Sequence, residues 1–131
     1  MKKDLKILLI DGVEKDRKNV KHLLKRSNFN LDLIEAENCN CGVEIVKAQE
    51  FDCILANYHL SDAKGIEVID QIRQANANGA PVIVLAAMGS ETMAVEVLKK
   101  GAADYVSKNG LNSEVLKRSI TNAVQIHQFQ Q

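Results

Sequence analysis

Five short apolar segments, separated by amphipathic stretches, constrain the fold of this 131-residue chain more than any other feature. They are Leu5 to Ile10, Leu31 to Ala36, Cys53 to Ala56, Val82 to Ala87 and Ala103 to Val106. Such alternation is typical of repeated βα units around a parallel sheet. The segments are rich in Ile, Val and Leu along their length, as expected of strands that helices cover on both faces. The sequence therefore predicts an α/β fold.

Apolar residues at helical spacing predict the covering helices. The stripes consist of Val20, Leu23 and Leu24, of Ile66, Val68, Ile69 and Ile72, and of Leu116, Ile120, Ala123 and Val124. Asn112 or Ser113 is placed to cap the last helix, and Gly101 stands where a C-terminal helix stop is expected. We expect a core of residues 5–124 followed by a polar tail, residues 125–131, which is either a frayed helix end or a linker.

Size and composition limit the classes of function. A chain of 131 residues suits one hydrophobic core, so a single domain is expected over residues 1–131. No apolar segment approaches the roughly 18 residues that a membrane span needs. The first apolar segment is too short for a secretion signal, so we expect a cytoplasmic protein without a membrane partner.

The charge balance argues against nucleic acid as a partner. Seventeen basic residues match seventeen acidic ones, so the chain lacks the positive field on which non-specific nucleic-acid binding depends. Six basic residues nevertheless cluster between Lys15 and Arg26, with only Asp16 among them. This cluster fits a docking site for an acidic partner or, as we favour, a solvated helix face.

The cysteine pattern predicts reduced thiols and no metal. The cysteines are Cys39, Cys41 and Cys53, an odd number in a chain without an export signal. Cys39 and Cys41 could supply half of a zinc site, but such a site needs about four ligands in grouped pairs. The three histidines provide no second pair. We therefore expect neither a metal nor a cofactor.

Residues that follow the strands are the candidates for a functional site. In an open α/β sheet, ligands collect at the carboxyl ends of the strands, near the point where the strand order reverses. This rule selects Asp11-Gly12, Asn57-Tyr58, Ala86-Ala87 and Lys108. We expect these residues to converge on one edge of the sheet although they are distant in the sequence.

Four stretches together resemble the receiver domain of two-component response regulators. They are ILLID at 7–11, NYHLSDAKG at 57–65, PVIVLAA at 81–87 and AVEVLKKGAADYVSK at 94–108. The resemblance covers nearly the whole chain, from Leu5 to about Val124. It implies the flavodoxin-like (CheY-like) (βα)5 fold, a doubly wound parallel sheet of five strands in the order 2-1-3-4-5.

In that family, two adjacent carboxylates and an acceptor aspartate hold Mg²⁺, and the acceptor is the nucleophile. A hydroxyl and a lysine stabilise the charge on the phosphoryl oxygens. The resemblance places Asp11 and Gly12 at the carboxylate positions, Asn57 at the acceptor, Ala86 at the hydroxyl and Lys108 at the lysine. Three of these five positions lack the required group, and an amide is a poor nucleophile.

We therefore expect a degenerate phosphoacceptor pocket with no catalytic residue and no bound metal, in which Asp11 is a remnant of the Mg²⁺ site. Asp11 and Lys108 are expected to form an ion pair that closes the pocket through Asn57. The leading hypothesis is a non-enzymatic pseudo-receiver that binds a protein: a histidine kinase, an output domain or a second copy of itself.

The resemblance also implies an interaction face made by the fourth helix, the fifth strand and the fifth helix. We expect it around Tyr105, Met93 and Val97 and on the exposed side of Ser113 to Ile126. Because Ala86 has no side chain beyond Cβ, the ring of Tyr105 is expected to lie inward and to keep this face in one active-like state. The phenolic hydroxyl must then find a partner or reach solvent.

Two alternatives remain open at this stage. One is a phosphorylatable response regulator with an atypical or engineered-out acceptor, for which Asp62 and Asp104 are the nearest candidates. The other is a pseudo-receiver that senses a small redox ligand such as a quinone, which Cys53 and the vacated pocket support only slightly.

Overall fold

Strands and helices alternate along the chain in the computed structural model, which describes residues 4–28, 30–76, 78–87 and 89–129. The strands are β1 (Asp4–Ile10), β2 (Asn30–Ala36), β3 (Cys53–Asn57), β4 (Val82–Ala86) and β5 (Asp104–Ser107). The helices are α1 (Glu14–Lys25), α2 (Cys39–Ala48), α3 (Ile66–Ala75), α4 (Glu91–Lys99) and α5 (Ser113–Phe129). Each strand lies within one residue of its predicted bounds. Among the described helices, none is long and apolar enough to cross a membrane.

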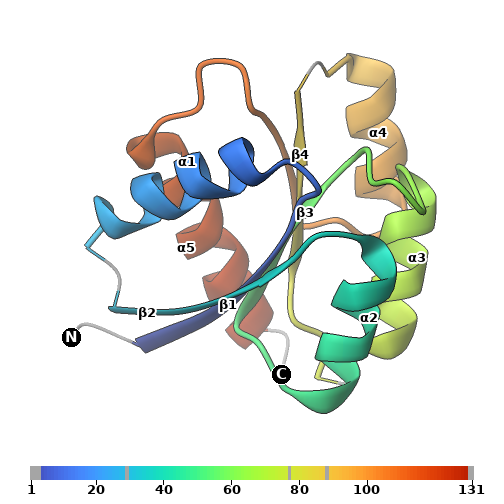
Figure 1. Ribbon diagram of the computed structural model, residues 1–131, viewed down its shortest axis with the longest axis horizontal. Helices are drawn as coiled ribbons and strands as arrows, with labels where there is room; N and C mark the ends of the chain where they lie inside the picture. The colour runs from blue at the N-terminus through green and yellow to red at the C-terminus, as the bar shows by residue number, and fades with distance from the viewer. Residues whose placement is uncertain (1–3, 29, 77, 88, 130–131) are drawn as a thin grey trace.

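The five strands form one parallel sheet in the order β2-β1-β3-β4-β5, as predicted. Helices α1 and α5 cover one face, and α2, α3 and α4 cover the other (Figure 1). Every residue of β3 and β4 is buried, because these central strands have a helix layer on both sides.

Alternate side chains of each strand enter different apolar clusters. Ile7 and Leu9 of β1 pack with α1 and α5, whereas Leu8 and Ile10 pack with residues of α2 and α3. A third cluster, formed by Ile69, Val84, Val97 and Ala102, lies under α4, with Tyr58 and Tyr105 packed against it. The sheet thus separates the apolar clusters on its two faces and contributes side chains to both. Burial of this apolar surface, worth about 25 cal/mol per Å², is the main contribution to the stability of the fold.

Side chains cap several helices at the positions where the chain leaves the sheet. The Asn38 carboxamide accepts from Cys41 N at 2.8 Å at the start of α2, and the Ser90 hydroxyl accepts from Met93 N at 3.2 Å at the start of α4. Of the two predicted caps of α5, Asn112 is the one that accepts, from Val115 N at 2.9 Å. Helix α5 continues to Phe129, so most of the expected polar tail is helical.

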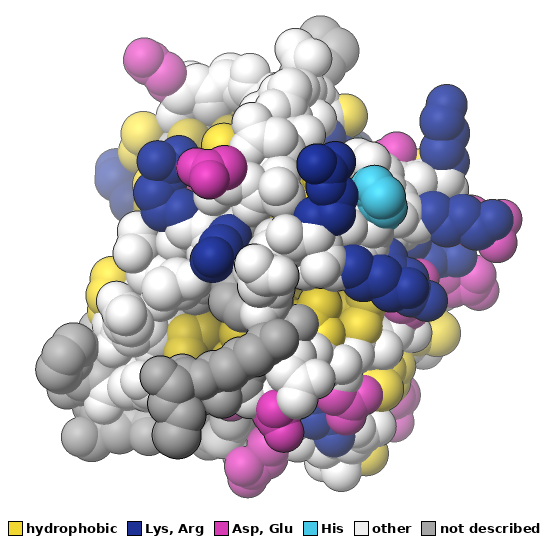
Figure 2. Space-filling model, turned by 90° about the vertical axis from the view of Figure 1, so that its left-hand side faces the viewer, with side chains coloured by type: hydrophobic (Ala, Val, Ile, Leu, Met, Phe, Trp, Pro, Cys, Tyr) yellow, Lys and Arg dark blue, Asp and Glu magenta, His cyan; other side chains and the backbone are white. Residues whose placement is uncertain are grey.

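The basic cluster of the sequence lies on the outer surface of α1. Figure 2 shows Lys and Arg side chains gathered on the side of the molecule that α1 and α5 form. Among the residues that the structure describes, Arg17 is the member of the cluster with an acidic partner, at 3.2 Å from Glu35 Oε1. Lys15, Lys18 and Lys21 are exposed. The exposure fits both a solvated face and a docking surface.

Candidate functional site

The carboxyl ends of the strands bring the predicted residues together at one edge of the sheet. Asp11 directly follows β1, Asn57 ends β3, Ala86 ends β4, and Lys108 directly follows β5. The backbone amide of Lys108 donates to the Ala86 carbonyl at 2.8 Å, which joins the last two positions. The predicted convergence of these residues is confirmed, because parallel strands present their carboxyl ends to the same edge.

Lys108 is held by two carboxylates at this edge. Its ammonium nitrogen Nζ lies 2.6 Å from Asp11 Oδ2 and 2.8 Å from Asp16 Oδ2. The side chain of Asp11 has no exposed surface, and that of Lys108 is 12% exposed. The other oxygen of Asp11, Oδ1, accepts from Val13 N at 3.0 Å, so both oxygens of this buried carboxylate have donors. The arrangement is a compact, charge-assisted ion-pair cluster.

The second carboxylate corrects one prediction. We expected the pocket to close through Asn57, but Lys108 instead pairs with Asp16, in the first turn of α1. The Asn57 carboxamide donates to the His59 carbonyl at 2.7 Å, and its oxygen Oδ1 is buried without a partner among the described residues. A carboxylate attracts an ammonium more strongly than an amide oxygen does, which explains why Asp16 takes this place. The one signal in the sequence was Asp16 itself, the single acidic residue in a basic run.

The residues at this edge do not fit the Mg²⁺ site that the family implies. Asp11 directs Oδ2 at the Lys108 ammonium, and Gly12 adds no oxygen ligand from a side chain. Among these groups, the Asn57 oxygen is the one that is buried without a hydrogen-bond partner in the described part of the chain. Within the described part of the chain, no group of three or more His, Cys, Asp or Glu side chains could hold a metal ion. The ammonium of Lys108 lies against the carboxylate that a divalent ion would need.

The ring of Tyr105 lies inward. It packs against the cluster under α4, and its hydroxyl oxygen is buried without a hydrogen-bond partner among the described residues. Burial raises the pKa of this phenol, and the nearby backbone amide of Ser90 opposes the shift without reaching hydrogen-bond geometry. The ring tip contacts Gly89, where any Cβ would overlap the hydroxyl. The absence of a side chain at Gly89, a residue that we did not predict, therefore leaves room for the Tyr105 ring.

The predicted interaction face needs a correction at Val97. This residue has no exposed surface and belongs to the cluster under α4, while Met93 is half-buried. The apolar residues that α4 exposes are Val95 and Leu98, at 48% and 45%. Val97 was misplaced because its position relative to the sheet depends on how α4 is rotated about its axis, which α4's own sequence does not fix.

The two alternative acceptor residues have other partners. The Asp62 carboxylate accepts from Cys39 N and Asn40 N, each at 2.9 Å, and so caps the start of α2. Burial raises the pKa of Asp62, but these backbone hydrogen bonds outweigh it and hold the pKa below its usual value. Asp104 begins β5, at the opposite edge of the sheet from Asn57, and accepts from the Ser119 hydroxyl at 2.6 Å.

Two of the three cysteines are buried. Cys53 lies within β3, and burial raises its thiol pKa to about 12. Burial also raises the pKa of Cys39 to about 11, with a smaller contribution from the Asp62 charge. Cys41 is exposed. Protonated, buried thiols are poor nucleophiles, so the structure adds no support for redox chemistry at Cys53.

Comparisons with known proteins agree with this fold. Residues 7–121 match the family described as response regulator receiver domain. The chain is 33% identical over 112 residues to transcriptional regulatory protein SrrA of Staphylococcus aureus, a match that covers 86% of this chain and 45% of SrrA. The chain therefore spans less than half the length of that relative.

Solved structures show the same architecture. A response regulator receiver domain protein from Clostridium thermocellum has a TM-score of 0.84 at 22% identity, with 97% of this chain and 99% of that chain covered. A response regulator from Burkholderia pseudomallei, solved with a phosphorylated aspartic acid, a calcium ion and citrate, has a TM-score of 0.77 at 25% identity, with 97% and 73% covered. Since the family match extends over most of its length, this chain belongs to the response regulator receiver domain family of two-component signalling.

Proposed function

We propose that this chain is a pseudo-receiver, a cytoplasmic signalling domain that acts through protein–protein contact and not through phosphoryl transfer. The observation that carries the proposal is the position of Lys108, whose ammonium is shared by Asp11 and Asp16 beside an amide at residue 57. A phosphorylatable receiver needs a nucleophilic carboxylate, a metal held by acidic residues and a lysine available to the incoming phosphoryl group. Here the carboxylate is an amide, and the lysine is already paired.

The Burkholderia pseudomallei relative illustrates the missing chemistry. That structure was solved with a phosphorylated aspartic acid and a calcium ion. At the position that the resemblance assigns to the acceptor, this chain has Asn57, which bears no charge and donates to the His59 carbonyl. An uncharged amide does not attack phosphorus, and its oxygen brings no negative charge to the binding of a divalent cation.

The proposed partner is a protein that binds the α4–β5–α5 face whether or not a phosphate is present. It is a histidine kinase, an output domain or a second copy of the chain. Support comes from the inward ring of Tyr105 and from the exposed Val95 and Leu98 on α4. Because the ring already fills the space beside Gly89, we infer one constant, active-like surface. Nothing in the charge balance favours nucleic acid as the partner of this domain.

The test is phosphorylation by a small acyl phosphate in the presence of Mg²⁺. Intact-mass spectrometry of the protein after incubation with acetyl phosphate is expected to show no species heavier by about 80 Da, the mass of a phosphoryl group. The Asn57→Asp variant restores the acceptor carboxylate alone. The Gly12→Asp/Asn57→Asp variant also restores the second metal-binding carboxylate. A hydroxylamine-labile adduct on the unmodified protein would contradict the proposal and would favour a regulator with an atypical acceptor.

A further inference from the structure

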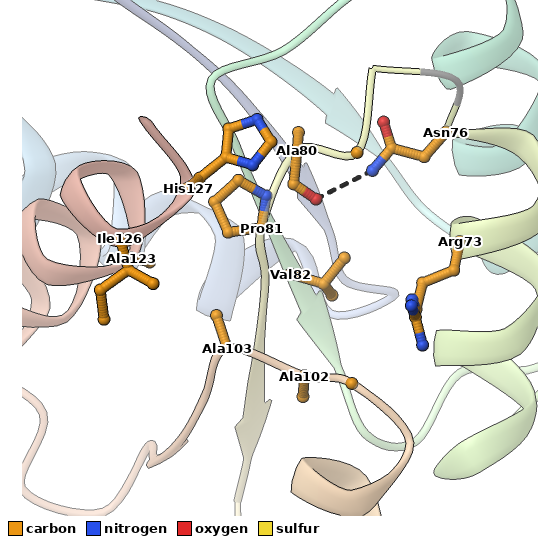
Figure 3. Close-up of a pocket in the computed structure, with 12 residues that line it drawn as sticks. Arg73, Asn76, Ala80, Pro81, Val82, Ala102, Ala103, Ala123, Ile126 and His127 are labelled. Carbon is orange, nitrogen blue, oxygen red and sulfur yellow. Dashed lines mark hydrogen bonds between the residues drawn. The ribbon is translucent and has the colours of Figure 1, made fainter. Parts of the chain in front are cut away.

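A cavity of about 480 Å³ lies at the edge of the sheet opposite Asp11 and Lys108. Its walls come from the ends of α3 and α5 and from the segments that enter β4 and β5 (Figure 3). The volume falls within the range of about 300–1,000 Å³ that is typical of small-molecule sites. We propose that this cavity binds a small organic carboxylate with an apolar body.

Small, apolar side chains line part of the cavity. They are Ala80, Pro81, Val82, Ala102, Ala103 and Ala123. Figure 3 shows Ala123 on α5, and the other five lie between α5 and Arg73 on α3. An aromatic or short aliphatic body placed there removes apolar surface from water, which favours binding by about 25 cal/mol per Å².

Arg73 supplies the positive charge that selects an anion. Its Nη1 donates to the Lys100 carbonyl at 2.7 Å, and a Cβ at Gly101 would overlap the guanidinium. One guanidinium donor is thus bound to the backbone, and Arg73, which lines the cavity, has further N–H donors for a ligand. Among the described residues, no carboxylate pairs with Arg73 and none lines the cavity. Asp70, three residues earlier on α3, lies 4.0 Å from the Lys100 ammonium instead.

The helix ends near this edge oppose an anion, because the C-terminus of a helix carries a partial negative charge. At the end of α4, backbone N–H donors reduce this partial negative charge. The carbonyl of Leu98 accepts from Gly101 N at 3.1 Å, and that of Val97 accepts from Ala102 N at 3.0 Å. A full charge on a positioned guanidinium, which can bind a carboxylate through two N–H groups, outweighs these partial charges.

The experiment is a heteronuclear NMR titration of the full 131-residue chain with benzoate, and with benzamide as its uncharged analogue. We expect saturable shifts of the amides around the cavity with benzoate and at least about tenfold weaker binding of benzamide. Arg73→Gln is expected to weaken benzoate binding by a similar factor. Ala103→Phe is expected to abolish it by filling the cavity, since Ala103 is exposed and its backbone bond to Val82 O is retained.

Arg26→Gln is the matched control, because Arg26 is exposed at the end of α1 and does not line the cavity. It should leave benzoate binding unchanged. Equal binding of benzamide, or benzoate binding that survives Arg73→Gln, would overturn the assignment of an anion. Binding that survives Ala103→Phe would overturn the assignment of this cavity. None of these outcomes depends on phosphorylation at residue 57, so the pseudo-receiver proposal is tested separately.

Discussion

Lys108 Nζ lies 2.6 Å from the buried Oδ2 of Asp11, across 97 positions of sequence. The pair connects the ends of β1 and β5, which are not neighbours in the sheet. A charged lysine bound to a carboxylate with no exposed surface is a contact that the protein cannot lose without leaving a charge unpaired.

Replacing Lys108 with methionine is therefore expected to destabilise the protein by about 3 kcal/mol, because the buried Asp11 carboxylate loses its cation. Urea unfolding followed by circular dichroism measures the change. Asp16→Asn is the comparison, since Asp16 is 38% exposed and should contribute less than about 1 kcal/mol. Equal effects of the two substitutions would show that Asp11 is not the main partner.

Mg²⁺ is expected to show no saturable binding to the unmodified protein in calorimetry, because Lys108 engages the carboxylates of Asp11 and Asp16 and Gly12 supplies no oxygen from a side chain. Gly12→Asp with Asn57→Asp should recover binding. A Cβ at Gly12 lies 3.2 Å from the Glu37 carbonyl, so the loop must shift by a few tenths of an ångström. Gly12→Asn with Asn57→Asp is the matched variant with one charge fewer, and it should bind more weakly. Saturable binding by the unmodified chain would contradict our view of the site.

Tyr105→Phe is expected to leave stability unchanged or to raise it by up to about 1 kcal/mol, because it removes a buried hydroxyl that lacks a hydrogen bond. Thermal unfolding of this variant and of Tyr58→Phe, a second half-buried tyrosine of the same cluster, makes the comparison. A loss of more than about 1 kcal/mol in Tyr105→Phe would mean that the hydroxyl has a partner in solution, with the Ser90 amide as the first candidate.

The buried thiols predict a loss of stability in alkali. Below the ordinary thiol pKa of 9.0, Cys53 is protonated in the folded and unfolded states alike. Above it, only the unfolded thiol ionises, so the free energy of unfolding should fall by about 1.4 kcal/mol per pH unit until the folded pKa of about 12 is reached. Cys53→Ala should flatten this part of the pH profile. An unchanged slope would contradict the assignment.

Iodoacetamide labelling checks the same burial at neutral pH. Cys41 is exposed and should be alkylated in the native protein, whereas Cys39 and Cys53 should react only in denaturant. Intact-mass spectrometry counts the added groups. Rapid native alkylation at more than one site would show that α2 or β3 opens readily.

Asp62→Asn is expected to destabilise the protein by about 0.5–1 kcal/mol at neutral pH, since the carboxylate caps α2 through two backbone amides. The pKa of Asp62 is lowered in the folded state. Its contribution is therefore present above the unfolded pKa of 3.8 and lost as the pH falls through the folded value. Unfolding curves at several pH values should show the variant and the unmodified protein converging in acid. Asp32→Asn, at an exposed position of β2, is the control and should have little effect.

The sequence by itself determined the fold and the strand-end residues that meet at the site. Strands that are apolar along their whole length need helices on both faces of the sheet to bury their side chains. Parallel strands place Asp11, Asn57, Ala86 and Lys108 at one edge of the sheet whatever the details of packing. The helix stop at Gly101 could also be predicted, because a left-handed φ of 105° there is a local requirement of the backbone.

Only the tertiary structure decided which partners these residues have. Asp16 reaches Lys108 because the first turn of α1 lies at the same edge of the sheet as the residue that follows β5. Val97 is buried while Val95 and Leu98 are exposed because of how α4 is rotated on the sheet. The cavity beside Arg73 likewise arises where α3 and α5 meet the segments that enter β4 and β5. Each of these contacts joins residues that are distant in the chain, so it depends on the relative placement of helices and not on local propensity or periodicity.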